Sequence, residues 1–177
     1  MGMGKPHIQK TIEKIYIIDS CALINLFRHS GLPYEPYPED LFPNLWKKIK
    51  GMTNSGILIS HTSVYKEISR KDDQAKDWCE KNKRMFKDVD ECQLEVFQQV
   101  RQSYDPHYWK RELNKNSEWA DPWIIALSVC HGNATIVTDE KMTDHNNPNV
   151  GNRIPDIARK LNIPCMNLMD FLREVGI

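Results

Sequence analysis

Long hydrophobic runs are missing from this sequence. Although 40% of its 177 residues are hydrophobic, no stretch approaches the roughly 18 apolar residues that a membrane-spanning helix requires. The opening residues, MGMGKPHIQK, contain no apolar segment of the kind that a secretory signal peptide needs. Pro6 also occupies the position where a myristoylation signal has Ser or Thr. We therefore expect a cytoplasmic protein with no membrane partner.

An excess of charge of one sign is missing as well. The chain has 24 Lys and Arg residues against 24 Asp and Glu residues, so its formal net charge is zero. Overall charge therefore gives no argument for nucleic-acid binding. Basic residues do gather locally, although a solvated helix face explains any single cluster, and these clusters lie at 47–50, 81–87 and 110–111.

Paired cysteine motifs are missing too. The five cysteines are an odd number and include no Cys-x-x-Cys pair, and they are Cys21, Cys79, Cys92, Cys130 and Cys165. Neither a disulfide framework nor a zinc cluster is indicated by this spacing. We expect reduced thiols, most of them buried.

The length predicts a single domain over residues 1–177, because such a chain can form one full hydrophobic core but is short for two. Residues 1–12 precede the first apolar run and are expected to be a flexible N-terminus. The segment 30–43 is predicted to be an irregular excursion, because it carries four prolines, at Pro33, Pro36, Pro38 and Pro43.

Short apolar runs alternate with helical patterns along the chain. The runs predict β-strands at 15–18, 57–60, 134–137 and 164–167. The helical spacing predicts helices at 22–27, 44–50, 62–70, 73–86, 90–104, 122–131, 155–161 and 168–175. Gly51 is expected to end the helix 44–50, and 105–117 is expected to be a loop. This alternation indicates an α/β fold with a parallel sheet and helices on both of its faces.

Four acidic residues stand where the predicted strands end or the next helices begin. Asp19 directly follows the first strand, and Asp139 directly follows the strand 134–137. Glu67 lies one turn into the helix after the second strand, and Asp121 begins the helix 122–131. In an open parallel sheet the ligand site lies outside the carboxyl ends of the strands. We therefore expect these four side chains to meet at one edge.

Each of these acids also has an ordinary structural explanation. Asp19 is a possible N-cap of the helix it precedes, and Asp121 before Pro122 has the usual arrangement of an N-cap and first helical residue. Glu67 suits an exposed helix face, and Asp139 suits a turn. The four positions together favour a shared role.

Clustered carboxylates have a definite chemical preference. Two carboxylates about 4 Å apart repel each other by roughly 4 kcal/mol at an effective dielectric constant near 20, so they must share protons or cations. Oxygen ligands without His or Cys partners select Mg²⁺ or Mn²⁺ over Zn²⁺. An acidic cluster with such an ion on an α/β domain most often acts on phosphate esters.

The sequence resembles the PIN-domain nuclease superfamily, which includes the VapC toxins of bacterial toxin-antitoxin pairs. The similar motifs occur in order along most of the chain, and they are Asp19-Ser20, Ser63-x-x-x-Glu67, Ala120-Asp121-x-x-Ile124-x-Ala126 and Ile136-Val137-Thr138-Asp139. The C-terminal part looks like that of an uncharacterised PIN subgroup with a longer chain than a minimal toxin.

This resemblance implies a doubly wound sheet of about five parallel strands and metal-dependent cleavage of RNA. Asp19, Glu67 and Asp121 match the metal-binding acids of the family, and Asp139 matches the fourth, with the adjacent Glu140 as an alternative. The ions implied are Mg²⁺ or Mn²⁺, and the partners implied are an RNA substrate, an antitoxin protein and a second copy in a homodimer.

Smaller details of the same motifs remain open. Ser20 and Thr138 are candidates to hold the carboxylates by hydrogen bonds, although ordinary turn bonds explain these hydroxyls equally well. Cys21 stands where the family often has Asn, and it also argues against a haloacid-dehalogenase-like enzyme, which needs Asp at that place. The alternative to a nuclease is a catalytically inactive PIN-like module that binds RNA or a protein.

Overall fold

A five-stranded parallel sheet forms the centre of the computed structural model, which describes residues 13–28, 33–143 and 152–177. The predicted N-terminus 1–12, the start of the excursion 30–43 and most of the loop expected after residue 143 lie outside the described residues. The strands have the spatial order β3-β2-β1-β4-β5. They are β1 (Ile15–Ile18), β2 (Leu58–His61), β3 (Phe86–Lys87), β4 (Ala134–Val137) and β5 (Cys165–Met166).

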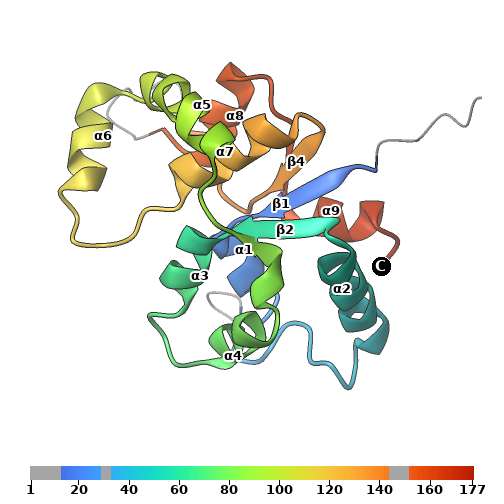
Figure 1. Ribbon diagram of the computed structural model, residues 1–177. Coiled ribbons are helices and arrows are strands. Elements are labelled where there is room, and N and C mark those ends of the chain that lie inside the picture. The colour runs from blue at the N-terminus through green and yellow to red at the C-terminus, as the bar shows by residue number, and fades with distance from the viewer. Residues whose placement is uncertain (1–12, 29–32, 144–151) are drawn as a thin grey trace, which may run out of the picture.

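Helices cover both faces of this sheet, as Figure 1 shows. The connections between β1 and β3 run along one face, and they contain α1 (Ser20–Asn25), α2 (Pro43–Ser55), α3 (Thr62–Ile68), α4 (Gln74–Lys81) and the 3-10 turn η1 (Lys83–Met85). The opposite side holds α5 (Glu91–Gln102), α6 (Pro106–Leu113), α7 (Asp121–His131) and α8 (Ile154–Lys160), and α9 (Leu168–Glu174) ends the chain. The doubly wound α/β fold expected from the sequence is thereby confirmed.

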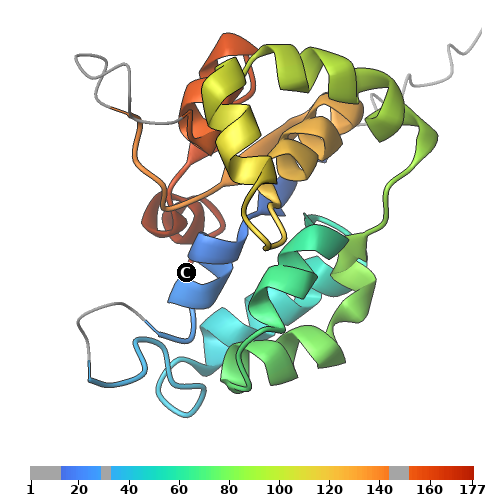
Figure 2. The same cartoon turned by 90° about the vertical axis from the view of Figure 1, so that its left-hand side faces the viewer.

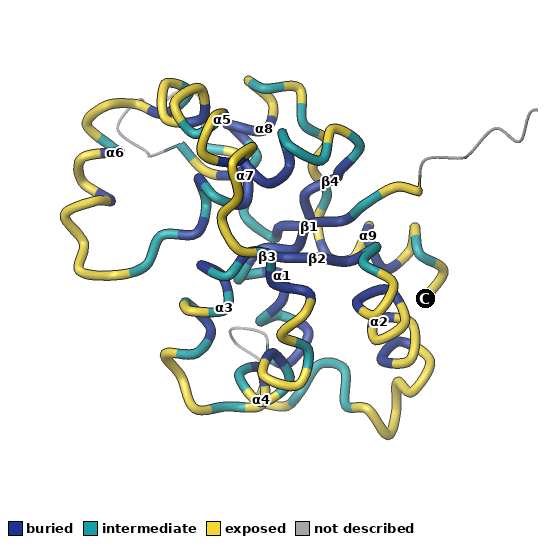
Figure 3. The backbone as a smooth tube through the Cα atoms, in the orientation of Figure 1, coloured by how far each residue is buried: buried dark blue, intermediate teal, exposed yellow. Residues whose placement is uncertain are grey.

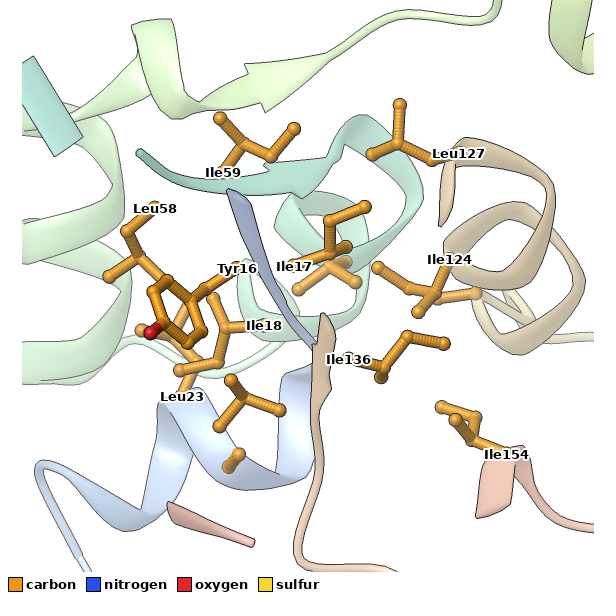
Figure 4. Close-up of a cluster of buried hydrophobic side chains, with 14 of the residues drawn as sticks. Tyr16, Ile17, Ile18, Leu23, Leu58, Ile59, Ile124, Leu127, Ile136 and Ile154 are labelled. Atoms are coloured by element: carbon orange, nitrogen blue, oxygen red, sulfur yellow. The ribbon is translucent and has the colours of Figure 1, made fainter. Parts of the chain in front are cut away.

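The core has one layer on each face of the sheet, because side chains alternate along a strand. Ile17 of β1 and Ile136 of β4 are paired in register and lie on the side of Ile124 of α7 (Figure 4). Ile18 lies on the opposite side, with Leu23 of α1. All five side chains are fully buried. Figure 3 shows the same division, with buried strands inside and a mostly exposed α6 at the periphery.

The helix bounds differ from the sequence prediction at α2. We expected Gly51 to end this helix, but α2 continues to Ser55, and Gly56 caps it with a left-handed φ of 76°. The buried face explains the extra turn, because Met52 and Thr53 also face the core. Gly56 is the position that needs a residue without a side chain, since other residues rarely adopt this φ.

The segment 105–117 was predicted to be a loop, and this prediction is wrong. Asp105 accepts hydrogen bonds from the backbone of His107 and Tyr108, and Pro106 occupies the first helical position of α6. The signal was present in the sequence, because Asp followed by Pro is a frequent start of a helix. Trp109 anchors this helix with only 8% of its surface exposed.

A disulfide joins Cys92 of α5 to Cys130 of α7, which corrects the expectation that all five cysteines are reduced. The two residues are 38 positions apart and meet because α5 packs on α7. The free cysteines are Cys21, Cys79 and Cys165, of which Cys165 is exposed. Among the helices that the structure describes, none is long and apolar enough to cross a membrane.

Candidate active site

The predicted site residues lie at the carboxyl end of the sheet, where β1 and β4 are neighbours. The chain leaves β1 into α1 on one face and leaves β4 toward α8 on the other face (Figures 1 and 2). At such a switch point the two connections diverge and leave room for a ligand. Asp19 follows β1 and Thr138 follows β4, so the two residues stand side by side across this point.

Asp19 is 3% exposed and is held by three donors. One oxygen accepts the backbone N–H of Ala22 at 2.8 Å, which makes Asp19 the N-cap of α1. The other oxygen accepts the Thr138 hydroxyl at 2.6 Å and the Cys21 thiol at 3.0 Å. Asp19 is thus both the helix cap that its position suggests and a carboxylate fixed at the switch point.

Burial raises the pKa of Asp19 to about 7, and the charge of Glu140 acts in the same direction. The bonds from Thr138, Ala22 and Cys21 favour the charged form but do not offset the lost hydration. Near neutral pH this carboxyl group is therefore only partly ionised. A cation bound beside it favours the charged form.

Glu67 connects three elements of the site. One of its oxygens accepts the backbone N–H of Ala120 at 2.9 Å, and the Ser20 hydroxyl also bonds to its carboxylate. Burial raises the pKa of Glu67. Glu67 therefore does not lie on a purely solvated helix face, because it fastens α3 to the start of α7 and to α1.

Asp121 does not cap its helix, contrary to the structural alternative that the Asp-Pro pair suggested. Ala120 is the N-cap of α7, and Asp121 is the first helical residue. The carboxylate instead accepts a hydrogen bond from the Trp119 side chain. Burial raises its pKa well above the ordinary value, and the charges of Glu140, Asp19 and Glu67 raise it further. Asp121 is thus the group on which the other three acids act together.

Asp139 and Glu140 are adjacent but face different surroundings. Asp139 accepts the side-chain amide of Asn25 at 2.6 Å with one oxygen and the backbone N–H of Leu168 at 2.8 Å with the other. Both of its oxygens are therefore used to hold α1 and α9. Glu140 accepts the backbone N–H of Ile154 at 3.0 Å, and its charge raises the pKa of Asp121.

The structure therefore brings Asp19, Glu67, Asp121 and Glu140 into one electrostatic group, whereas both oxygens of Asp139 bind Asn25 and Leu168. Within residues 13–28, 33–143 and 152–177, however, no three His, Cys, Asp or Glu side chains are arranged as a formed metal site. The carboxylates instead bind protein donors, through Thr138, Ala120 and Ile154. A shared ion would require their free oxygens to turn toward one another.

The two candidate hydroxyl groups hold carboxylates, as the sequence suggested. Thr138 bonds to Asp19, and Ser20 bonds to Glu67. Cys21, at the position where the PIN pattern has Asn, supplies a thiol donor to Asp19. Asn25 and Trp119 were not anticipated, because their partners come from distant segments or require the loop before α7 to turn back.

The tryptophans next to basic residues are not exposed platforms. Trp46 and Trp109 are each 8% exposed and fix the segments around them. Trp123 is partly buried and stacks on His61 with ring centroids 5.6 Å apart and on Phe97 at 4.3 Å. These rings belong to the packing of α5 and α7 on the sheet.

A model of one protein family matches residues 16–177, and its description reads "Domain of unknown function (DUF4411)". The match includes every acid of the site and begins within β1. No curated protein and no solved structure matches the chain.

Proposed function

The chain belongs to the DUF4411 family, and from this premise we propose that it is a metal-dependent endoribonuclease with a PIN-like site, which hydrolyses phosphodiester bonds of RNA. The observation that carries the proposal is the group formed by Asp19, Glu67, Asp121 and Glu140 at the switch point. The charges of the other three acids all raise the pKa of Asp121. A structural role for one cap does not require four acids in this arrangement.

The donor set fits Mg²⁺ or Mn²⁺ in its chemistry. All four groups are carboxylates, and hard oxygen ligands suit these ions. No ion pair among the described residues includes Asp19, Glu67 or Asp121, so a bound cation would neutralise charges that otherwise raise one another's pKa. When bound, Mg²⁺ or Mn²⁺ supplies Lewis acidity that lowers the pKa of water and offsets charge on the phosphate. Asp19, Asp121, Glu67 and Glu140 would hold it.

The protein's own contribution is to position these carboxylates. Thr138 and Cys21 fix Oδ2 of Asp19, while the N–H of Ala22 fixes Oδ1. Such hydrogen bonds orient ligand carboxylates and keep their lone pairs aimed at one place. Trp119 does the same for Asp121.

We propose Glu140, in place of Asp139, as the fourth acid of the site. Asp139 uses both oxygens to bind Asn25 and the start of α9. Glu140 binds the N–H of Ile154 with one oxygen, and its other oxygen has no hydrogen-bond partner among the described residues. A cavity of about 660 Å³ borders Glu140 and not Asp139, and a second cavity, of about 740 Å³, borders both residues. A ligand can therefore approach this carboxylate from the β4 side.

The alternative is a PIN-like module that binds RNA or protein without cutting. One observation favours it, namely that the carboxylates bind protein donors and do not form a ready metal site among the described residues. The role as toxin of a type II pair, the antitoxin partner, the homodimer and the cytoplasmic location are proposals that rest on the resemblance and the composition.

The test is cleavage of a short single-stranded RNA of mixed sequence, in Mn²⁺ or Mg²⁺ and in EDTA. We expect the wild type to cleave only with the ion, and we expect Asp19→Asn and Asp121→Asn to be inactive while remaining folded by circular dichroism. If the wild type binds this RNA without cutting it, the inactive module is the correct function. If the variants cleave as fast as the wild type, the acidic site is not the active site.

A further inference from the structure

The larger cavity beside Glu140, of about 740 Å³, is a place where a ligand can touch the acidic site. Its walls come from four parts of the chain, namely the end of α1, the segment before α2, the residues after β4, and α9. The volume is within the range of small-molecule sites in proteins. Because Glu140 is one of the lining residues, a ligand in this cavity lies against the acidic site.

Two basic side chains line this cavity. Lys141 directly follows Glu140, is exposed, and forms no hydrogen bond or ion pair with any residue that the structure describes. Arg173 of α9 donates one N–H to Asp170 at 2.9 Å, in an ion pair whose side chains are 69% and 54% exposed. Such an exposed pair contributes little to stability, and the guanidinium group has further N–H donors. Both cations can therefore bind an anion that enters the cavity.

These two cations offset an electrostatic problem of the site. A nucleic-acid strand carries a negative charge on each phosphate, and the carboxylates of the acidic site repel it. Asp139 and Glu140 line the same cavity, and Asp139 uses both of its oxygens to bind protein donors. Lys141 and Arg173 therefore supply the positive charge that a strand needs on this side of Glu140.

Tyr37 forms the aromatic part of the wall. Its backbone carbonyl accepts the Trp46 indole N–H at 2.7 Å, and its hydroxyl donates to the sulfur of Met169 at 3.2 Å. Phe42 packs edge-on against the ring, with centroids 5.6 Å apart. These contacts fix the ring beside α9, and Met169, which is 47% exposed, continues the apolar wall. A fixed aromatic ring of this kind is a surface on which any base can stack.

We propose that this cavity holds the nucleotide next to the scissile bond of a single-stranded RNA, with Lys141 and Arg173 on its phosphate and Tyr37 against its base. The inference rests on the proposed function, because it takes Glu140 as part of the cleavage site. A cluster of lysines alone would bind any polyanion. Cations next to an aromatic ring and a thioether suit a ligand that has both a phosphate and a base.

The experiment compares Lys141→Gln and Tyr37→Leu with the wild type. Lys50→Gln is the matched control, because Lys50 is an exposed lysine of α2 that lines neither cavity beside Glu140. Tyr37→Phe keeps the ring and removes the bond to Met169. Binding of a fluorescein-labelled single-stranded RNA is followed by anisotropy in Ca²⁺ at several KCl concentrations, and cleavage of the same RNA is followed in Mn²⁺. Melting temperatures are measured without RNA.

We expect Lys141→Gln to weaken RNA binding about 5-fold in 0.1 M salt and to reduce the slope of log affinity against log salt by about 0.7, as for the loss of one phosphate contact with a single strand. Lys50→Gln should leave both quantities unchanged, and neither substitution should lower the melting temperature. An equal loss in the two lysine variants overturns the inference, because the effect then follows from net charge. Unchanged binding by Lys141→Gln overturns it as well.

Tyr37→Leu should weaken binding roughly 5- to 150-fold, which is the range for one stacked base. Tyr37→Phe should lose much less, because the ring remains. Equal losses in Tyr37→Leu and Tyr37→Phe would show that the hydroxyl matters and the ring does not, which contradicts stacking. Because Lys141 is exposed, its variant tests the cavity even where Tyr37→Leu lowers the melting temperature.

The failure of this inference differs from the failure of the proposed function. If the wild type binds RNA without cutting it, and Lys141→Gln and Tyr37→Leu bind less tightly, the cavity is an RNA-binding site and the hydrolytic function is refuted. If the wild type cuts and both variants bind and cut equally well, only the role of the cavity is refuted. If the wild type neither binds nor cuts, both are refuted.

Discussion

The Thr138 hydroxyl donates a 2.6 Å hydrogen bond to the Asp19 carboxylate, across 119 positions of sequence. It also accepts the backbone N–H of Glu140 at 3.1 Å. One hydroxyl group therefore connects the ends of β1 and β4, where it orients the Asp19 carboxylate and holds the backbone of Glu140. Several expectations depend on this connection.

Replacing Thr138 tests the contribution of its two hydrogen bonds to stability. Thr138→Val removes the hydroxyl but keeps the branched shape, so Asp19 loses a donor and the Glu140 N–H loses an acceptor. We expect the free energy of unfolding to fall by about 1–3 kcal/mol, as measured by urea denaturation. Thr138→Ser retains the hydroxyl and should lose less than half as much. Equal losses in the two variants would show that the methyl group, and not the hydrogen bond, is the important part.

Asp19→Asn should make the metal-free protein more stable at about pH 8 while it abolishes cleavage. The folded pKa of Asp19 is raised to about 7 from an ordinary value of 3.8. Its contribution to stability is therefore complete below pH 3.8 and is lost as the pH rises through about 7. Asn keeps the helix cap without the charge. Melting temperatures in EDTA across this range, with Asp19→Ala as the variant that also loses the cap, provide the measurement.

Divalent ions should make the wild type more stable than Asp19→Asn at about pH 8, which is the reverse of the order expected in EDTA. Mn²⁺ should raise the melting temperature of the wild type at about pH 8, because a ligand that binds only the folded state stabilises it. Asp19→Asn should respond much less. An equal rise in both proteins would place the ion at another site.

Glu140 and Asp139 should give opposite results on substitution. Glu140→Gln should lower cleavage at least about 100-fold with little change in melting temperature, if its charge serves the reaction. Asp139→Asn should lower the melting temperature, because Asp139 binds Asn25 and the N–H of Leu168, and should leave most of the cleavage. The reverse pattern in a side-by-side assay would make Asp139 the fourth acid.

His61 should make the fold sensitive to acid. Burial lowers its folded pKa to about 4, with Lys66 acting in the same direction and Asp88, Glu118 and Asp90 opposing. Its unfolded value is near 6.5, so stability that is complete above this value is lost as the pH falls from 6.5 toward 4. His61→Asn, which retains a capping side chain, should make the melting temperature depend less on pH over this range. The exposed His107→Asn should not, and identical curves for both variants would argue against His61.

The Cys92–Cys130 disulfide can be tested by counting the thiols that react with a thiol reagent. Denatured protein that has not been reduced should react with three equivalents of a thiol reagent, and reduced protein with five. In the loop-entropy account, closing a loop of this length contributes about 3–4 kcal/mol, so a reductant should lower the melting temperature. Cys165→Ser should respond to reductant as the wild type does. Five reactive thiols in protein purified without reductant would mean that the bond does not form in the cell that produced it.

The sequence was sufficient for four of the five strands, because short apolar runs such as Ile15–Ile18 and Ala134–Val137 are typical of a buried parallel sheet. The strand β3 was missed, because its two residues fall at the end of the predicted helix 73–86, which in the structure ends at Lys81. The sequence was also sufficient to place Asp19, Glu67 and Asp121 at one edge. It could not choose between Asp139 and Glu140, because neighbouring side chains after a strand point in opposite directions and either can face the site. The disulfide was missed because its cysteines meet only once α5 packs on α7.

Helix α7 carries Asp121 at its first position and the cross-linked Cys130 near its last. With a rise of about 1.5 Å per residue, α7 is a short helix whose C-terminal end is joined to α5 by the disulfide. The disulfide therefore ties α7 to α5, whereas Glu67 lies in α3 on the opposite face of the sheet. The hydrogen bond from the Ala120 N–H to Glu67 joins these two groups of helices beside the acidic site.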